Sequence, residues 1–166
     1  MRTNSLNNLW MGLLILGLTV MACGEQGSST ADAEAAPVKE SSVTVKATGD
    51  VMTEIAYSPS TLVSEPGSVI KVTFVNESAV AGMYHNMILV AMGKEKEVIA
   101  ACMAAGPDKE FVADMPEVLA ASKLLNIGET TEFEIKVPDA PGNYPIICSY
   151  PGHYPIMKAE LQVIAN

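Results

Sequence analysis

The chain has 166 residues, of which 49% are hydrophobic, and its formal net charge at pH 7 is −9, with 19 acidic against 10 basic residues. This length and apolar content suit one domain with a real hydrophobic core. The acidic balance argues against a nucleic-acid-binding protein and against electrostatic attachment to anionic lipid, because both targets attract basic surfaces.

The first 22 residues have the features of an export signal. Arg2 supplies a positive charge, residues 9–20 form a short apolar run, and the small residue Ala22 precedes Cys23. This arrangement is typical of a cleaved signal peptide. The Cys after a small residue resembles a bacterial lipobox, which implies cleavage before Cys23 and attachment of lipid to its sulfur. The alternatives are an ordinary signal peptide and an uncleaved anchor, although the run is short for a membrane span.

Residues 23–41 are predicted to form a lipid-anchored, flexible linker. They are rich in Ala, Ser and Gly and lack the apolar content of a core. Removal of residues 1–22 from 166 leaves 144 residues with 9 Lys, no Arg and 19 acidic residues, a net charge of −10. Two or three acyl chains would hold such a protein on a membrane, whereas one alone is marginal. We therefore expect an exported protein, lipid-anchored to a bacterial membrane on its periplasmic or cell-surface side.

Residues 42–166 are predicted to form one all-β domain. Apolar residues alternate with polar ones or run continuously over six short stretches, at residues 43–47, 69–75, 86–91, 131–137, 144–148 and 159–164. A period of two indicates strands with one buried face. Short strands separated by Gly and Pro turns predict an antiparallel sandwich.

One segment departs from the strand pattern. Residues 107–125 are rich in helix-forming side chains, with Asp108 and Glu110 in the first turn. Pro116 would split or restart a helix. We expect one or two short helices inserted between strands and packed outside the sheets.

The side chains that carry chemistry gather near the C-terminus. Cys148, His153 and Met157 follow one another with the spacing Cys-x4-His-x3-Met, and the chain has only one other histidine, His85. Cys148 ends an apolar stretch, and a Pro-Gly turn before His153 would fold the chain back toward it. A thiolate, two imidazoles and a weak axial thioether are the ligands of a blue-copper electron-transfer site. We therefore predict that these four side chains bind one copper ion.

Other interpretations of these residues stay open. Zinc is the main competing metal, since Cys and His bind it well, although a thioether as fourth ligand favours copper. Met157 could instead be a core methionine. A copper-binding or copper-delivery lipoprotein without a role in electron transport is the second functional hypothesis. A metal-free structural lipoprotein would leave the spacing unexplained. A copper enzyme needs further histidines for a second copper, and both are already used, so we do not expect an enzyme.

These residues resemble the azurin and auracyanin branch of the cupredoxins over residues 42–166. The Cys-x4-His-x3-Met spacing, the His85-Asn86 pair and the region at residues 103–111 carry the resemblance. It implies a cupredoxin-like Greek-key β-sandwich or barrel with a short inserted helical segment. It also implies that the four residues named above bind a single type 1 copper.

The resemblance implies two further roles beside the metal. The main-chain carbonyl of Tyr84 would make a weak axial contact with copper, although azurins carry Gly at this place. Asn86 would tie the two ligand loops together near the Cys148 sulfur.

A docking patch is predicted at the loop that carries His153. Met83, Met103, Pro151 and Gly152 would form an apolar surface around the edge of this ring, which is expected to be exposed and to serve as the electron port. Flexible methionines suit several partners, and redox proteins such as a cytochrome or a membrane oxidoreductase are the expected ones. The alternative is that Met83 and Met103 fill gaps in the core.

Cys102 lies outside this scheme. Lipid takes Cys23 and metal takes Cys148, so no intramolecular disulfide is expected. Cys102 is predicted to be a small buried hydrophobic residue, with a labile surface thiol as the alternative.

Overall fold

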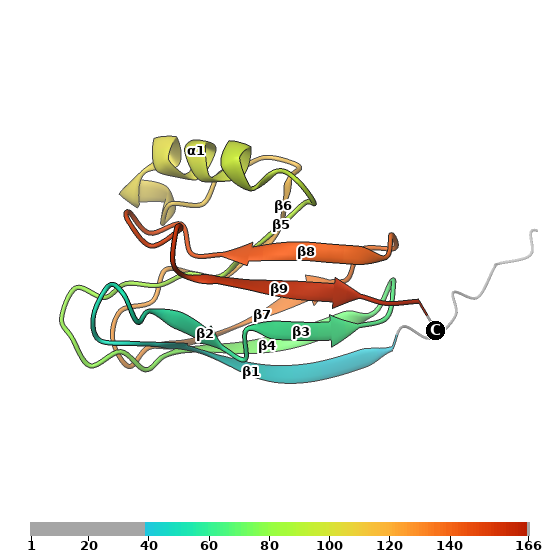
Figure 1. Cartoon of the computed structure of the whole chain (residues 1–166), viewed down its shortest axis with the longest axis horizontal. Coiled ribbons are helices and arrows are strands. Elements are labelled where there is room, and N and C mark those ends of the chain that lie inside the picture. The colour runs from blue at the N-terminus through green and yellow to red at the C-terminus, as the bar shows by residue number, and fades with distance from the viewer. Residues whose placement is uncertain (1–38, 166) are drawn as a thin grey trace, which may run out of the picture. The chain divides into compact units, whose positions relative to one another are not determined.

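The computed structural model describes residues 39–165, which fold into two β-sheets packed against each other with one helix beyond them (Figure 1). The predicted export signal, Cys23 and most of the predicted linker lie outside the described residues. The first strand begins at Glu40, two residues before the predicted start of the domain. Within the described part, no helix is long and apolar enough to cross a bilayer.

The first sheet has the strand order β2-β1-β4-β7. Its strands are β1 (Glu40–Thr48), β2 (Ala56–Ser58), β4 (Val69–Asn76) and β7 (Thr130–Lys136). Every second side chain of β4, namely Ile70, Val72 and Phe74, is buried in the core between the sheets. The period of two seen in the sequence thus marks the buried face of this strand.

The second sheet has the strand order β3-β9-β8-β5-β6. Its strands are β3 (Thr61–Ser64), β5 (Ile88–Val90), β6 (Val118–Ala121), β8 (Gly142–Ile147) and β9 (Lys158–Val163). The predicted sandwich of two sheets is present, but it is not antiparallel throughout, because β1 pairs with β4 and β3 pairs with β9 in parallel. The chain crosses to the second sheet as β3 before it returns as β4, so β4 can run in the same direction as β1.

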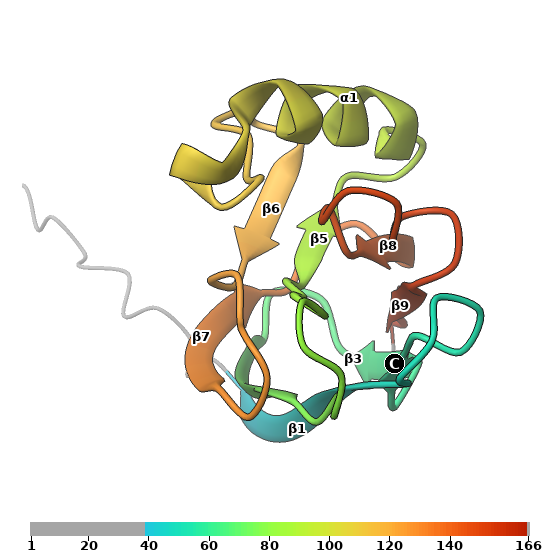
Figure 2. The same cartoon turned by 90° about the vertical axis from the view of Figure 1, so that its left-hand side faces the viewer.

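Strand β5 is buried on both faces, which explains its continuous apolar sequence. Leu89 faces the core between the sheets, whereas Ile88 and Val90 join a second cluster on the outer face. Helix α1 (Glu95–Ala105) covers that face and contributes Val98 and Cys102 to the cluster (Figures 1 and 2). Cys102 is therefore a buried hydrophobic residue, and burial raises the pKa of its thiol.

The short inserted helical segment is present, but most of residues 107–125 is not helical as predicted. Only the short 3-10 helix η1 (Pro107–Lys109) falls there, and Val118–Ala121 forms the edge strand β6 beside β5. Hydrogen bonding to β5 outweighs the helical propensity of this stretch. The longer helix is α1, which carries Glu95 and Glu97 in its first turn, where negative charge complements the helix dipole.

Three strands were not predicted. β2, β3 and β6 have only three or four residues each, which is too short for a repeated pattern to stand out.

Candidate metal centre

His85, Cys148 and His153 meet in the interior of the protein. The Nδ1 atoms of the two imidazoles lie 3.2 Å apart, and the Cys148 Sγ lies 3.9 Å from the first and 3.7 Å from the second. One potential ligand atom of each residue lies within 4.8 Å of those of the other two. All three side chains are buried. The fold thus brings the distant His85 to the two residues that share one loop.

The pleat of β8 directs Cys148 into the protein. Tyr144, Ile146 and Cys148 alternate along the chain and all belong to the core between the sheets. Ile147, between the last two, belongs instead to the cluster under α1. Because successive side chains of a strand point to opposite faces, the thiol of Cys148 points inward.

His85 is fixed by main-chain and side-chain hydrogen bonds. It forms an isolated β-bridge with Leu125, with N–H to carbonyl distances of 3.1 and 2.8 Å. Its Nε2 lies 3.2 Å from the Ser78 hydroxyl, which in turn donates to the Gly49 carbonyl at 3.0 Å. The single hydroxyl proton is used on Gly49, so Ser78 accepts a hydrogen bond from the Nε2–H of His85. This tautomer leaves Nδ1 unprotonated and free to bind a metal.

Sequence reasoning did not identify Ser78. The residue follows a strand, as many serines do, and nothing in its local sequence distinguishes it. Only the fold places it against a histidine seven positions further along the chain.

The loop after β8 positions His153 and Met157. The N–H of Met157 donates to the His153 carbonyl at 2.9 Å, and the N–H of Cys148 donates to the Met157 carbonyl at 3.4 Å. The N–H of His153 donates to the Tyr150 carbonyl at 3.0 Å. Met157 is fully buried in the same core cluster as Cys148. The loop therefore closes on itself and holds three of the four predicted ligands in one unit.

The His153 side chain is less exposed than we predicted from its position in a loop. Its relative exposure is only 2%, although Pro151 and Gly152 beside it are exposed. The ring of Tyr150 packs against the His153 ring with centroids 4.9 Å apart. The expectation of an exposed ring is therefore wrong, because neighbouring side chains cover it.

Asn86 connects the loop of His85 with the loop of Cys148. Its Oδ1 accepts a hydrogen bond from the Ser149 N–H at 2.9 Å. Its Nδ2 donates to the Ser149 hydroxyl at 2.8 Å and to the Glu110 carbonyl at 3.0 Å. Asn86 and Ser149 are fully buried. A buried amide with both ends hydrogen-bonded fixes the separation of the segments that it joins.

Burial governs the ionisation of the three clustered groups. It lowers the pKa of His85 to about 4, with the nearby His153 contributing in the same direction, and it also lowers the pKa of His153. Both imidazoles are therefore neutral near pH 7, which is the form that binds metals. Burial raises the pKa of the Cys148 thiol to about 11. A thiolate here needs a cation beside it, and a bound metal ion supplies that charge.

The donor set fits a type 1 copper ion. Two imidazole nitrogens and one sulfur form the trigonal set of blue-copper sites, with a weak thioether as the usual axial donor. Among the described residues, this cluster includes no carboxylate. A structural zinc site would require a fourth strong donor. The remaining buried candidate on the loop is Met157, whose thioether suits copper better than zinc.

The predicted patch residues differ in exposure. Met83 is half-buried against the main core, which agrees with the alternative that it fills a gap there. Met103 on α1 is exposed. Pro151 and Gly152 are exposed, and so is Ile156 on the same loop, which the sequence did not single out.

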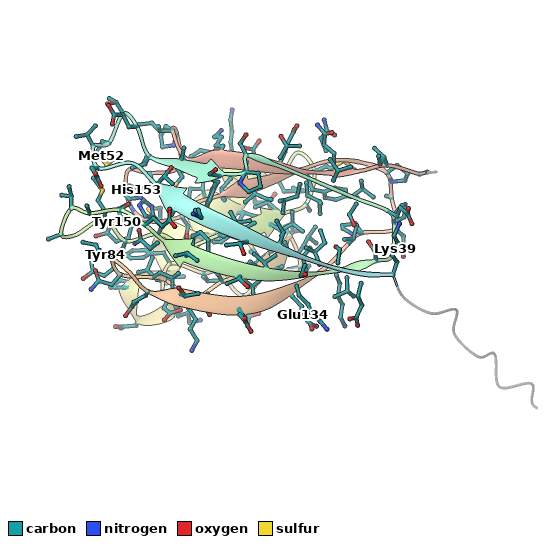
Figure 3. The ribbon with its side chains drawn as sticks, turned by 90° about the horizontal axis from the view of Figure 1, so that it is seen from below. Lys39, Met52, Tyr84, Glu134, Tyr150 and His153 are labelled. Atoms are coloured by element: carbon teal, nitrogen blue, oxygen red, sulfur yellow. The ribbon has the colours of Figure 1, made fainter. Side chains whose placement is uncertain are left out.

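The surroundings of the site lie at one end of the sandwich. Met52, Tyr84, Tyr150 and His153 lie together there, whereas Lys39, the first described residue, lies at the opposite end (Figure 3). Met52 was not predicted because its place in the loop between β1 and β2 gives no local signal. Its exposed side chain nevertheless adds apolar surface beside the Pro-Gly turn of the ligand loop, close to Gly152.

The proteins whose sequences resemble the chain include an auracyanin and an azurin. Auracyanin-A from Chloroflexus aurantiacus is 37% identical over 113 residues, which cover 66% of this chain and 68% of that protein. An azurin from Pseudomonas fluorescens biotype C is 34% identical over 82 residues, which cover 48% of this chain and 64% of the azurin. No family model matches the chain.

A solved structure resembles the fold as well. That of auracyanin A, described as a "blue" copper protein from a green thermophilic photosynthetic bacterium, matches with a TM-score of 0.67 and 32% identity. The match covers 76% of this chain and all of the auracyanin chain.

Proposed function

The chain belongs to the auracyanin and azurin family of cupredoxins, and from this membership we propose that it carries single electrons between redox proteins. The observation that carries the proposal is the convergence of two imidazole nitrogens and one sulfur in a buried site. Copper, when bound there, supplies a one-electron couple between Cu(II) and Cu(I). No substrate is chemically transformed in this role, so the protein is not an enzyme.

Copper would be held by His85, Cys148 and His153, with the Met157 thioether as a weaker donor. The buried position of Met157 on the same closed loop supports its assignment. The main-chain carbonyl of Tyr84, directly before His85, would be a second weak donor.

The chain's own contribution is to hold the donors in one arrangement. Ser78 orients the His85 ring, Asn86 fixes the spacing of the two ligand loops, and main-chain bonds close the loop from Cys148 to Met157. Donors that do not move on a change of oxidation state keep the reorganisation small. Burial also excludes water from the ligands. This favours retention of the metal together with fast electron exchange.

We infer that partners dock at the end of the sandwich that holds the site. Exposed apolar side chains there, including Met52 and Ile156, add to the predicted surface of Met83, Met103, Pro151 and Gly152. An apolar surface next to a buried redox centre allows close approach without a charged contact. The net charge of −9 favours redox partners with a basic rim around their own apolar face.

The membrane assignment rests on the sequence. Cys23 after the apolar run is proposed as the lipidated residue, and the linker predicted at residues 23–41 as the tether, of which residues 23–38 precede the described chain. Lys39, the first described residue, lies at the end of the sandwich opposite His153 (Figure 3).

An optical spectrum of the purified protein with added Cu(II) tests the proposal. An intense visible band from thiolate-to-copper charge transfer, together with a reversible one-electron couple in voltammetry, is expected. A colourless protein without a paramagnetic copper signal would contradict it. A delivery protein would pass Cu(I) rapidly to a chelator, whereas the buried site described above is expected to retain it.

A further inference from the structure

Glu110 and Phe111 adopt a backbone conformation that is uncommon for residues other than glycine. Their φ angles are 54° and 57°, in the left-handed region. The main chain around them is closed, because the Glu110 N–H donates to the Pro107 carbonyl and the Phe111 N–H donates to the Gly106 carbonyl, both at 2.9 Å. A left-handed φ costs free energy in a residue with a side chain, and it persists only where the surrounding structure requires it. We call these two residues the left-handed turn.

The carbonyls of the left-handed turn accept hydrogen bonds from both segments that carry the proposed metal ligands. The Glu110 carbonyl accepts one from the Nδ2 of Asn86 at 3.0 Å. The Phe111 carbonyl accepts one from the Ser149 hydroxyl at 2.6 Å. Asn86 directly follows one proposed ligand in the chain, and Ser149 directly follows another. The turn is therefore bonded to the neighbour of a ligand on each segment.

The Phe111 carbonyl also fixes the order of the bonds between Asn86 and Ser149. The Ser149 hydroxyl has a single proton, and the short distance to the Phe111 carbonyl assigns the proton to that bond, because the Oδ1 of Asn86 is further away at 3.1 Å. The hydroxyl oxygen then accepts from the Nδ2 of Asn86 at 2.8 Å, and the Oδ1 accepts the Ser149 N–H at 2.9 Å. All the polar atoms of this buried pair thus have partners only while the turn is in place.

Packing on both sides keeps the left-handed turn in place. Ala113 belongs to the cluster under α1, and Val112 packs against that cluster. The Phe111 ring meets the Tyr150 ring edge-on, with centroids 5.7 Å apart, and Tyr150 in turn packs against His153. The turn therefore connects the cluster under α1 with the loop that carries His153.

We propose that Glu110 and Phe111 are positioning residues of the metal site, whose main-chain carbonyls act on the ligand segments through Asn86 and Ser149. This inference rests on the proposed function as a copper protein. The turn is a third segment bonded to the two ligand segments, so neither of them can shift without breaking a buried hydrogen bond to it. A purely structural turn would stabilise the whole fold and would have no particular effect on the site.

Position 110 separates the backbone conformation from the chemistry of the side chain. Glu110 is exposed, so substitutions there leave the core packing intact. Glu110→Val introduces a β-branched residue, for which a left-handed φ is a steric outlier, whereas Glu110→Asn introduces a residue that tolerates it. Both variants remove the carboxylate, which accepts a hydrogen bond from the Leu124 N–H at 3.3 Å. A difference between the two variants therefore reports on the conformation of the turn.

The first measurement is amide hydrogen exchange in the metal-free protein. The Ser149 N–H, which donates to Asn86, reports on the site. The Val137 N–H, which donates to the Ser68 carbonyl at 2.8 Å, reports on the opposite end of the sandwich. In Glu110→Val we expect exchange that is about tenfold faster at Ser149 and unchanged at Val137, with wild-type exchange at both amides in Glu110→Asn. Equal acceleration at both amides in Glu110→Val, or none at either, overturns the inference.

The second measurement is copper affinity, determined by competition with a chelator. Glu110→Val should bind copper about tenfold more weakly than Glu110→Asn, as expected when the residues that support metal ligands are displaced. Glu110→Asn should match the wild type. Equal affinities of the two variants overturn the inference.

Ser149→Ala covers the case in which Glu110→Val does not fold. It removes the hydroxyl that lies between the Phe111 carbonyl and the Asn86 amide. Ser68→Ala is the matched control, since Ser68 is also buried and also donates to a main-chain carbonyl at 2.6 Å. We expect copper affinity about tenfold lower in Ser149→Ala and unchanged in Ser68→Ala, and wild-type affinity in Ser149→Ala overturns the inference.

The proposed function and the role of the turn fail in different ways. A wild-type protein that stays colourless with copper refutes the proposed function itself. A blue wild type whose position-110 variants bind copper equally well refutes the role of the left-handed turn alone.

Discussion

The Nδ1 atoms of His85 and His153 face each other at 3.2 Å although the residues are 68 positions apart in the chain. Ser78 accepts the Nε2–H of His85, so the facing nitrogen of that ring carries a free lone pair. This nitrogen, the Nδ1 of His153 and the Cys148 sulfur lie close enough together to form a site for a cation. Burial keeps both imidazoles uncharged near pH 7, which is the form that could bind a metal.

Cys148 and Met157 are expected to contribute differently to the centre. Cys148→Ser should abolish the visible charge-transfer band, because the thiolate is the electron donor of that transition. Met157→Leu should retain the band and raise the potential, because loss of a weak axial donor disfavours Cu(II). Optical spectroscopy and voltammetry of both variants check this. A Cys148→Ser protein that stays blue would show that another residue supplies the sulfur.

Ser78→Ala should weaken copper binding by on the order of 10- to 100-fold, the range found for loss of hydrogen bonds to metal-bound histidines. The substitution leaves the His85 ring free to rotate and to change its tautomer. Competition with a chelator measures the affinity. Ser68→Ala is the matched control, because Ser68 is also buried and also donates to a main-chain carbonyl, that of Glu65. Equal losses in the two variants would argue against a specific role of Ser78.

The metal-free protein should lose stability in acid through His85. Burial lowers the pKa of His85 to about 4, whereas an unfolded histidine titrates near its ordinary value of about 6.5. Between these two pKa values the unfolded chain binds a proton at His85 that the folded chain does not bind. The share of the unfolding free energy that depends on neutral His85 is therefore fully present above pH 6.5 and decreases as the pH drops toward 4. Titration of His85 over this pH range should change the free energy of unfolding by roughly 3 kcal/mol.

Urea unfolding at several pH values measures this effect. The comparison is with His85→Gln, in which the titrating group is absent and all carboxylates are retained. The wild type should lose more stability than the variant between pH 7 and pH 4. Parallel curves for the two proteins would show that His85 does not titrate as described. Copper should flatten the wild-type curve, since the bound metal competes with the proton.

Ile156→Lys should slow electron exchange with a cytochrome by about tenfold, because a charge on the apolar surface around the site opposes desolvation of the docked complex. The colour and the potential should not change, since Ile156 is exposed and its side chain is not a ligand. Stopped-flow kinetics measures the rate. Val63→Lys is the control, because Val63 is equally apolar, is exposed, and lines a hollow with Lys39 at the opposite end. Equal slowing in both variants would point to net charge rather than to the site face.

Local spacing allowed much of the site to be predicted. Cys148 and His153 lie five positions apart on one turn, so residue type and spacing already indicate the ligand chemistry. The main strands were predictable for the same reason, since alternation along β1, β4 and β7 records which face is buried. The helix was misplaced because pairing of β6 with β5 is a long-range interaction that local propensity does not contain.

The sequence by itself determined the chemical identity of the centre, because a thiol, two imidazoles and a thioether are properties of residue type and order. Only the tertiary structure decided which nitrogen of His85 faces His153, how deeply His153 is enclosed, and that Ser78 contacts His85. These contacts join segments that are remote in the chain. They depend on strand register and on packing between sheets, which no short stretch of sequence encodes.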